Sequence, residues 1–139
     1  MRSGRGGPFG AVVVRGGSIL GEGANSVIAL SDPTAHAEVM AIRDACGKLG
    51  QFSLAGATMY ASSEPCPMCL AATYWARIDS IVFASDRALA ARAGFDDSKF
   101  YDELAREPAA RAVPMRQIEL PEGIALFEEW IAKPDKTRY

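Results

Sequence analysis

The chain has 139 residues and a mass of 14.8 kDa, which is the size of one domain. Hydrophobic residues make up 49% and charged residues 23%, which excludes a mainly disordered chain. The net charge of −2 argues against a broad basic surface, so we expect no nucleic-acid partner. No apolar run approaches the roughly 20 residues of a membrane span. No signal peptide is recognisable, so we expect a cytoplasmic location without a membrane partner, where thiols stay reduced.

The first part of the chain predicts a β-hairpin. Residues 11–14 are largely β-branched, and Gly16-Gly17 follows them as a pair typical of a tight turn. Residues 18–23 form the expected returning strand, and a loop is expected at residues 27–31. Residues 1–7 are rich in glycine and arginine, and we expect them to be mobile.

A long amphipathic helix is predicted next. Asp32-Pro33-Thr34 combines a capping side chain with a proline suited to a first turn, and Gly50 lies just beyond Leu49. The helix is therefore predicted to extend from this start to about Leu49. Its buried face is predicted from apolar residues at helical spacing, which are Ala35, Val39, Ile42, Cys46 and Leu49.

The remaining elements alternate between strands and helices. They are predicted at residues 58–62 (strand), 66–77 (helix), 78–84 (strand), 87–93 (helix), 97–106 (helix), 115–120 (strand) and 122–132 (helix), with a loop at 108–114. The helix at 66–77 is apolar on almost every side, so we expect it to be buried. The order predicts one α/β domain over residues 1–139. Its three layers are a central mixed five-stranded sheet and helices on both faces.

Two of the three cysteines have the spacing of metal ligands. Cys66 and Cys69 are three residues apart at the start of a predicted helix, so both thiols lie on one side of it. The positive end of the helix dipole favours their thiolate forms. These two residues are therefore candidate ligands of one metal ion.

The single histidine of the chain, His36, lies two residues before Glu38. Two ligands on one helix are usually three or four residues apart, so this spacing suits one ligand and one group that reaches the site from the side. The resulting set of one histidine and two cysteines is typical of zinc with an open fourth position. Cys46 lies on the predicted apolar face of its helix, so we do not expect it to be a fourth ligand. A carboxylate could in principle close the site.

An open position on zinc has a chemical consequence. It holds a water molecule whose pKa falls toward neutrality, and Glu38 could take the proton of that water and return it to a substrate. The motif H-x-E followed by P-C-x-x-C is the signature of zinc-dependent nucleobase deaminases.

Further segments make the chain resemble bacterial guanine deaminases of the cytidine deaminase-like fold, a branch of the cytidine/deoxycytidylate deaminase superfamily. The related tRNA adenosine deaminases share the zinc motifs but typically have valine in place of Phe9. The guanine deaminases that the chain resembles usually begin with a helix. That helix is absent before the first glycines of this sequence, so we expect one sheet face to be uncovered. The segments that carry the resemblance are Pro8–Val12, Asn25, Asp32–Glu38, Glu64–Cys69, Tyr74–Arg77, Ala93–Asp97 and the terminal Tyr139.

The resemblance also implies roles for individual residues. One zinc ion per subunit is implied, and a homodimer in which a C-terminal segment, about 121–139, is exchanged between subunits. The implied roles are zinc ligation by His36, Cys66 and Cys69, proton transfer by Glu38, recognition and protonation of guanine by Asp97, a hydrogen bond to the purine from Asn25, and substrate contacts from Phe9, Ala37, Trp75 and Tyr139.

The implied reaction is hydrolytic deamination of guanine to xanthine and ammonia, with a small purine as substrate. The alternative enzymes are a tRNA adenosine deaminase or a guanosine deaminase. A non-enzyme alternative is a zinc-stabilised module that binds purines, and the non-ligand carboxylate of Glu38 is the feature that distinguishes catalysis from binding.

Overall fold

The computed structural model describes Gly4 and residues 6–138. They belong to two compact units, Met1–Ser98 and Lys99–Tyr139, which are taken here one at a time. The prediction of a single domain over residues 1–139 stays a prediction. In chain order the elements are β1 (Gly10–Arg15), β2 (Ser18–Ala24), α1 (Val27–Leu30), α2 (Ala37–Leu49), β3 (Thr58–Ser63), α3 (Pro67–Trp75), β4 (Ser80–Ser85), α4 (Arg87–Arg92), α5 (Ser98–Ala105), a 3-10 turn (Pro108–Ala110) and α6 (Pro121–Ala132).

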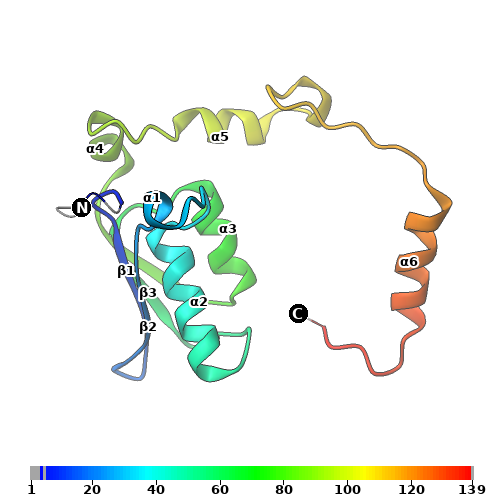
Figure 1. Cartoon of the computed structure of the whole chain (residues 1–139), viewed down its shortest axis with the longest axis horizontal. Helices are drawn as coiled ribbons and strands as arrows, with labels where there is room; N and C mark the ends of the chain where they lie inside the picture. The colour runs from blue at the N-terminus through cyan, green and yellow to red at the C-terminus, as the bar shows by residue number, and fades with distance from the viewer. Residues whose placement is uncertain (1–3, 5, 139) are drawn as a thin grey trace. The chain divides into compact units, whose positions relative to one another are not determined.

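The first unit is built on a mixed sheet with the strand order β2-β1-β3-β4. Figure 1 shows α2 and α3 on the same side of this sheet. β1 is antiparallel to β2 and to β3, whereas β3 is parallel to β4. A parallel pair needs a crossover connection, and α3 supplies it. The predicted α/β class with a mixed sheet is therefore confirmed.

The prediction of a fifth strand at residues 115–120 is wrong for the residues that the structure describes, where the sheet has four strands. This segment belongs to the second unit and pairs with no strand there. An extended segment becomes a strand only through backbone hydrogen bonds to a neighbour, and the local sequence pattern carries no information about that neighbour.

Helix α2 packs closely on β2 because both elements present small residues. A Cβ atom added to Gly21 would lie 2.7 Å from the carbonyl oxygen of Ala41 and 2.7 Å from the Cα atom of Ala45. Ala41 and Ala45 are completely buried. The helix and the strand therefore approach each other at a distance that only glycine and alanine allow.

This close packing explains why the predicted buried face of the helix is only partly right. Ala35 is buried, and Ile42 and Cys46 are half-buried at the edge of the core. Leu49 is 38% exposed. The prediction assigned large apolar side chains to the buried face. The close contact with Gly21 of β2 leaves room there only for the smallest apolar residues.

Substitution of Gly21 by alanine is expected to destabilise the protein by about 1–3 kcal/mol, since the added methyl group forces α2 away from β2. Gly47 provides the matched control on the exposed side of α2, because a Cβ atom there meets nothing within 4 Å. Gly47→Ala should stabilise the protein by up to about 1 kcal/mol through helix propensity. Urea unfolding of the two variants measures both changes, and equal effects of the same sign would contradict the packing argument.

Helix α2 also begins later than predicted. The Oδ1 atom of Asp32 accepts hydrogen bonds from the backbone N–H (2.8 Å) and the hydroxyl (2.7 Å) of Thr34. These two bonds lower the pKa of Asp32 and close a local turn in place of a first helical turn. The helix starts at Ala37 with His36 as its N-cap. The predicted loop at residues 27–31 is wrong as well, since Val27–Leu30 forms the short helix α1.

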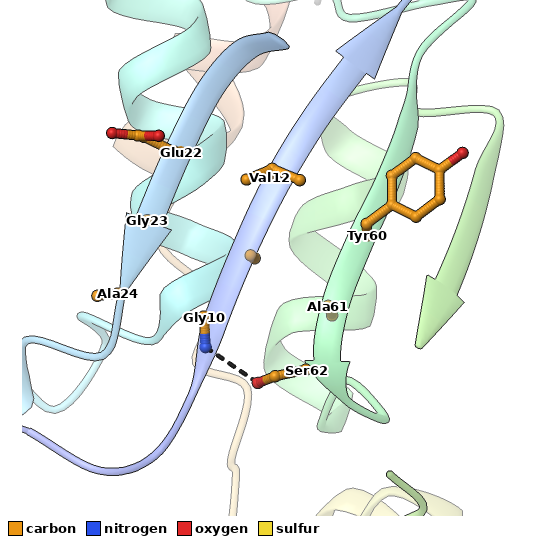
Figure 2. Close-up of a pocket in the computed structure, with 9 residues that line it drawn as sticks. Gly10, Val12, Glu22, Gly23, Ala24, Tyr60, Ala61 and Ser62 are labelled. Carbon is orange, nitrogen blue, oxygen red and sulfur yellow. Dashed lines mark hydrogen bonds between the residues drawn. The ribbon is translucent and has the colours of Figure 1, made fainter. Parts of the chain in front are cut away.

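The second face of the sheet carries exposed apolar side chains. Helices α2 and α3 contact each other, and α2 packs on the face of Val13 and Met59. The opposite face presents Val12 and Tyr60 beside Glu22 (Figure 2), and Tyr60 remains 46% exposed. Within the described part of the first unit, these helices thus cover one face.

The second unit contains most of α5 and all of α6. Helix α6 exposes large apolar side chains on several sides, among them Phe127 at 73%, Leu126 at 68% and Ile131 at 69%. Its C-terminal end is held by Lys136, whose ammonium group donates to the carbonyl oxygens of Ile131 and Lys133. Among the described residues, no helix has both the length and the apolar character needed to cross a membrane.

Candidate metal centre and active site

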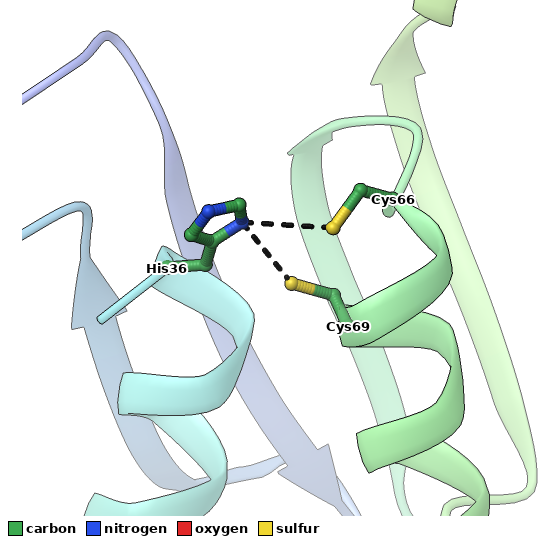
Figure 3. Close-up of side chains that lie close together, drawn as sticks. All are labelled: His36, Cys66 and Cys69. Atoms are coloured by element: carbon green, nitrogen blue, oxygen red, sulfur yellow. Dashed lines mark hydrogen bonds between the residues drawn. The ribbon is translucent and has the colours of Figure 1, made fainter. Parts of the chain in front are cut away.

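The N-terminal ends of two helices bring the candidate metal ligands together (Figure 3). His36 is the N-cap of α2, and Cys66 is the N-cap of α3. Cys69 follows in the first turn of α3 and is completely buried. The Nδ1 atom of His36 lies 3.6 Å from the sulfur of Cys66 and 3.5 Å from that of Cys69.

These distances fit a tetrahedral zinc ion. Zinc bonds of about 2.3 Å to sulfur and about 2.0 Å to nitrogen place tetrahedral N and S ligands about 3.5 Å apart. One donor atom of each of the three side chains lies within 4.8 Å of the others. The histidine nitrogen and the two sulfurs are the donors that zinc prefers, and three of them leave a fourth position for a water molecule or a substrate.

The electrostatics of the cluster favour a thiolate at Cys66. The Cys69 thiol beside Cys66 lowers the pKa of Cys66 to about 4, and the same contact raises the pKa of Cys69. A hydrogen bond with Cys66 raises the pKa of His36, although burial acts in the opposite direction. The positive ends of both helix dipoles also stabilise a thiolate at this point.

Glu38 reaches the same site without being one of the three grouped side chains. The backbone of His36 is extended, with φ −69° and ψ 155°, so the helical spacing between His36 and Glu38 does not apply. The Oε2 atom of Glu38 lies 3.5 Å from the sulfur of Cys69. Burial, with only 7% of the residue exposed, raises the pKa of this carboxyl group. Such a group can hold a proton closer to neutral pH than an exposed glutamate.

Asp97 lies in the segment between α4 and α5, inside the first unit. Burial is the main cause that raises its pKa, and the negative charge of Cys66 raises it further. The charge of Arg87 acts in the opposite direction. The role of Asp97 at the site stays a prediction.

Asn25 and Phe9 are joined through the N-terminal segment. The backbone N–H of Asn25 donates to the carbonyl oxygen of Phe9 at 3.0 Å, and the side-chain Oδ1 of Asn25 accepts from the N–H of Gly7 at 3.1 Å. The Phe9 ring packs edge-to-face on Phe95, with ring centroids 4.9 Å apart and an interplanar angle of 84°.

The other predicted substrate residues differ in their positions. Ala37 is the first residue of α2 and is completely buried between His36 and Glu38. Trp75 ends α3, at the opposite end of that helix from Cys66, and is 66% exposed. This exposure, together with that of Tyr74, makes the prediction of a buried helix wrong, although Cys69 and Thr73 are buried. Tyr139 lies outside the described residues.

Some residues around the site were not singled out from the sequence. The carboxylate of Glu64 accepts the backbone N–H of Arg87 at 3.1 Å and so joins the loop before Cys66 to the start of α4. The hydroxyl of Thr73 donates to the carbonyl oxygen of Cys69 at 2.8 Å. Phe95, which contacts Phe9, lies within the segment Ala93–Asp97 that carries part of the family resemblance, and this was the only signal for it in the sequence.

Comparisons with known proteins agree with the geometry of the cluster. Residues 2–85 match the family described as the cytidine and deoxycytidylate deaminase zinc-binding region. The whole chain is 47% identical to guanine deaminase of Bacillus subtilis (strain 168), covering 89% of that relative. A tRNA-specific adenosine deaminase of Aquifex aeolicus (strain VF5) is 44% identical over 78 residues, which cover 56% of this chain and 52% of the relative.

Solved structures give the same relationship in three dimensions. An X-ray structure of guanine deaminase from Bacillus subtilis aligns with a TM-score of 0.95 at 47% identity, covering 99% of this chain and 88% of that one. A structure of guanine deaminase from Nitrosomonas europaea aligns with a TM-score of 0.64 at 32% identity, covering 68% of this chain and 56% of that one. These findings confirm the family that the motifs predicted: the chain belongs to the cytidine and deoxycytidylate deaminase family, whose characteristic region binds zinc.

Proposed function

We propose that the protein is a zinc-dependent guanine deaminase that converts guanine and water to xanthine and ammonia in purine metabolism. The observation that carries the proposal is the likeness to a guanine deaminase along the whole chain, at 47% identity and a TM-score of 0.95. The cluster of His36, Cys66 and Cys69 supplies the donors that such an enzyme needs. A cytoplasmic location belongs to the same proposal.

The three side chains His36, Cys66 and Cys69 would hold the metal ion. A zinc ion bound in this way lowers the pKa of a water in its fourth position and so supplies a nucleophile near neutral pH. Glu38 accepts a proton from the attacking water and delivers it to a ring nitrogen of guanine, which makes C2 more electrophilic. As the water oxygen bonds to C2, Glu38 takes the second proton from that oxygen and transfers it to the amine at C2, whose bond to C2 breaks so that it leaves as ammonia. The buried position of Glu38 and its raised pKa suit both proton transfers.

Three further groups orient the base in this proposal. Asp97 accepts N–H groups of the guanine edge and assists the protonation of the departing amine. Asn25 uses its Oδ1 atom for Gly7, which leaves the Nδ2 group to donate to an acceptor of the purine. The backbone N–H of Ala37 belongs to the first turn of α2, where helices have no internal acceptor, and can donate to the substrate. Phe9 packs near the base in this proposal, whereas Trp75 ends α3 at the opposite end from Cys66 and has no part in it.

The alternative functions have weaker support. The tRNA-specific adenosine deaminase matches 56% of the chain, while the similarity to guanine deaminase extends through the C-terminal region. A guanosine deaminase would need space for a ribose beside the base. A purine-binding module without catalysis would not need the buried carboxylate of Glu38 beside the ligands.

The substrate is tested by ammonia release from guanine by the zinc-loaded protein, with guanosine, adenosine, adenine, cytosine, cytidine and a tRNA anticodon stem-loop assayed in parallel. We expect guanine to be deaminated at least about 100-fold more efficiently than the others, since a site built for one base edge leaves polar groups unpaired with another. Preferred turnover of another base would reject guanine. Zinc binding without turnover of any base would favour the binding module.

The proposal includes a homodimer with exchanged C-terminal segments, about residues 121–139. The exposed apolar side chains of α6 support it, because large apolar patches usually mark surfaces covered by a partner. Exchange of an identical element is also a low-cost route to a dimer. The three-layer arrangement predicted from the sequence requires helices on both faces of the sheet. It belongs to the dimer hypothesis, because the sheet face that carries Tyr60 is exposed in the first unit taken by itself.

Complementation between two inactive variants tests the exchange. The Glu38→Gln variant lacks the proton carrier but keeps Tyr139. The Tyr139→Ala variant lacks the C-terminal tyrosine but keeps Glu38. If Tyr139 acts in the partner's site, refolding an equal mixture should restore about one quarter of the wild-type sites, as random pairing of subunits predicts. If each chain completes its own site, the mixture will show only the mean activity of its two parents.

A further inference from the structure

Two chain segments that carry predicted substrate residues meet through one aromatic contact. The first is residues 6–9, which we call the N-terminal loop, and the second is residues 93–97, which we call the Asp97 loop. The rings of Phe9 and Phe95 join them edge-to-face, with centroids 4.9 Å apart. The two phenylalanines are 86 positions apart in the sequence, so this contact is a tertiary link and not a local one.

The N-terminal loop is held against Asn25 by its backbone. The N–H of Gly7 donates to the Oδ1 atom of Asn25, and the N–H of Asn25 donates to the carbonyl oxygen of Phe9. A Cβ atom added to Gly6 would collide with the backbone carbonyl group of Asn25. These contacts fix which way the carboxamide of Asn25 is turned.

The Asp97 loop is held at its other end by α4. Gly94 follows the helix with φ +92°, a conformation that favours glycine, and the N–H of Phe95 donates back to the carbonyl oxygen of Ala90 at 3.0 Å. Asp97 follows Phe95 by two residues, and the N–H of Ser98 donates to Asp96 at 2.9 Å. These backbone contacts hold Phe95 at the end of α4, two residues before Asp97.

Gly7 lies against both rings. A Cβ atom added there would be 3.1 Å from two atoms of the Phe9 ring and 3.2 Å from the Cζ atom of Phe95. The same residue donates the hydrogen bond that orients Asn25. Gly7, Phe9 and Phe95 are thus one packed unit, and a shift of either ring is transmitted to the backbone beside Asn25.

We infer that Phe95 is a positioning residue for substrate binding, which fixes Asp97 relative to Asn25 by packing on Phe9 and Gly7. The inference rests on the proposed function, because it assigns guanine as the base that Asn25 and Asp97 hold together. It concerns how the base is held, because the observed contacts of the Phe95 ring are with Phe9 and the space beside Gly7.

Phe95→Leu tests the inference, because leucine keeps an apolar side chain but removes the ring. Edge-to-face pairs contribute about 0.5–1.5 kcal/mol, so the KM for guanine and the dissociation constant of xanthine should each rise by a factor between about 2 and 12. We expect kcat to change less than about twofold, since the loop is ordered again once the base is bound. Xanthine is the product and is not turned over, so its binding by calorimetry is a readout separate from activity.

Leu89→Ala is the matched control. Leu89 lies on α4 in the same unit and is 48% exposed, close to the 45% of Phe95, and its backbone N–H keeps its bond to Asp86. Both constants should remain within about twofold of wild type in this variant. Gly7→Ala displaces the same rings from the other side and should reproduce the loss seen with Phe95→Leu. If Phe95→Leu fails to fold, Gly7→Ala carries the test.

A double-mutant cycle separates positioning from direct contact with the base. If Phe95 acts through Asp97, Phe95→Leu should not weaken xanthine binding further in an Asp97→Ala background. Hydrogen exchange should also become faster in residues 6–9 and 93–97 of Phe95→Leu, without any ligand. Unchanged binding in Phe95→Leu, or a loss that adds fully to that of Asp97→Ala, would overturn the inference. Failure of the wild type to bind xanthine or deaminate guanine would overturn the proposed function, and the inference with it.

Discussion

Glu38→Gln lowers kcat for guanine by about 1,000-fold and leaves one zinc ion bound per chain, if Glu38 carries the protons of the reaction. General acid–base groups contribute about 10²–10⁴-fold to enzymatic rates. Glutamine has the same shape as glutamate but cannot accept and return a proton. Steady-state xanthine formation and zinc analysis of the same sample measure the two quantities together.

Glu22→Gln is the control for this prediction. Glu22 is an exposed glutamate on β2, on the sheet face opposite α2, and its substitution should leave kcat within about twofold. A Glu38→Gln variant with kcat near that of wild type would reject Glu38 as the proton carrier. Loss of zinc from the same variant would instead identify Glu38 as a metal ligand.

The second large effect is expected at the cysteines. Cys66→Ser should reduce bound zinc to a small fraction of one ion per chain and lower activity more than about 1,000-fold, because the remaining His36 and Cys69 no longer form a three-ligand site. The thermal midpoint should fall by about 10 °C, since a ligand at 100 times its dissociation constant stabilises the fold by about 2.7 kcal/mol.

Cys46 supplies the matched cysteine control for this prediction. It is half-buried at the edge of the hydrophobic core, and burial raises the pKa of its thiol. Cys46→Ala should keep its zinc and its activity while losing some packing. Equal zinc contents in Cys66→Ser and Cys46→Ala would contradict the assignment of the metal centre.

The metal cluster could be predicted from the sequence because its signal is local. Cys66 and Cys69 share one helical turn, and His36 is the only histidine of the chain. The reach of Glu38 into the site was also predicted, but its cause was not. The backbone of His36 is extended and follows the turn closed by Asp32, so His36 lies outside the helix. For this reason the side chains of His36 and Glu38 can both reach the metal site.

Other features depend on contacts that no local pattern contains. The buried face of α2 follows the glycines of β2, in particular Gly21, and a pattern of hydrophobic size cannot detect them. Residues 115–120 have the composition of a strand but pair with no strand in the described chain. The contact of Phe9 with Phe95 joins the two ends of the first unit, so sequence spacing says nothing about it.

Zinc titration of the metal-free protein, followed by ammonia release from guanine, tests the central claim most directly. The account predicts no activity without metal and a rate that rises in proportion to added zinc until one ion per chain is bound, the number that the cluster of His36, Cys66 and Cys69 can hold. A guanine deamination rate independent of zinc, or no deamination of guanine at full zinc occupancy, would contradict it.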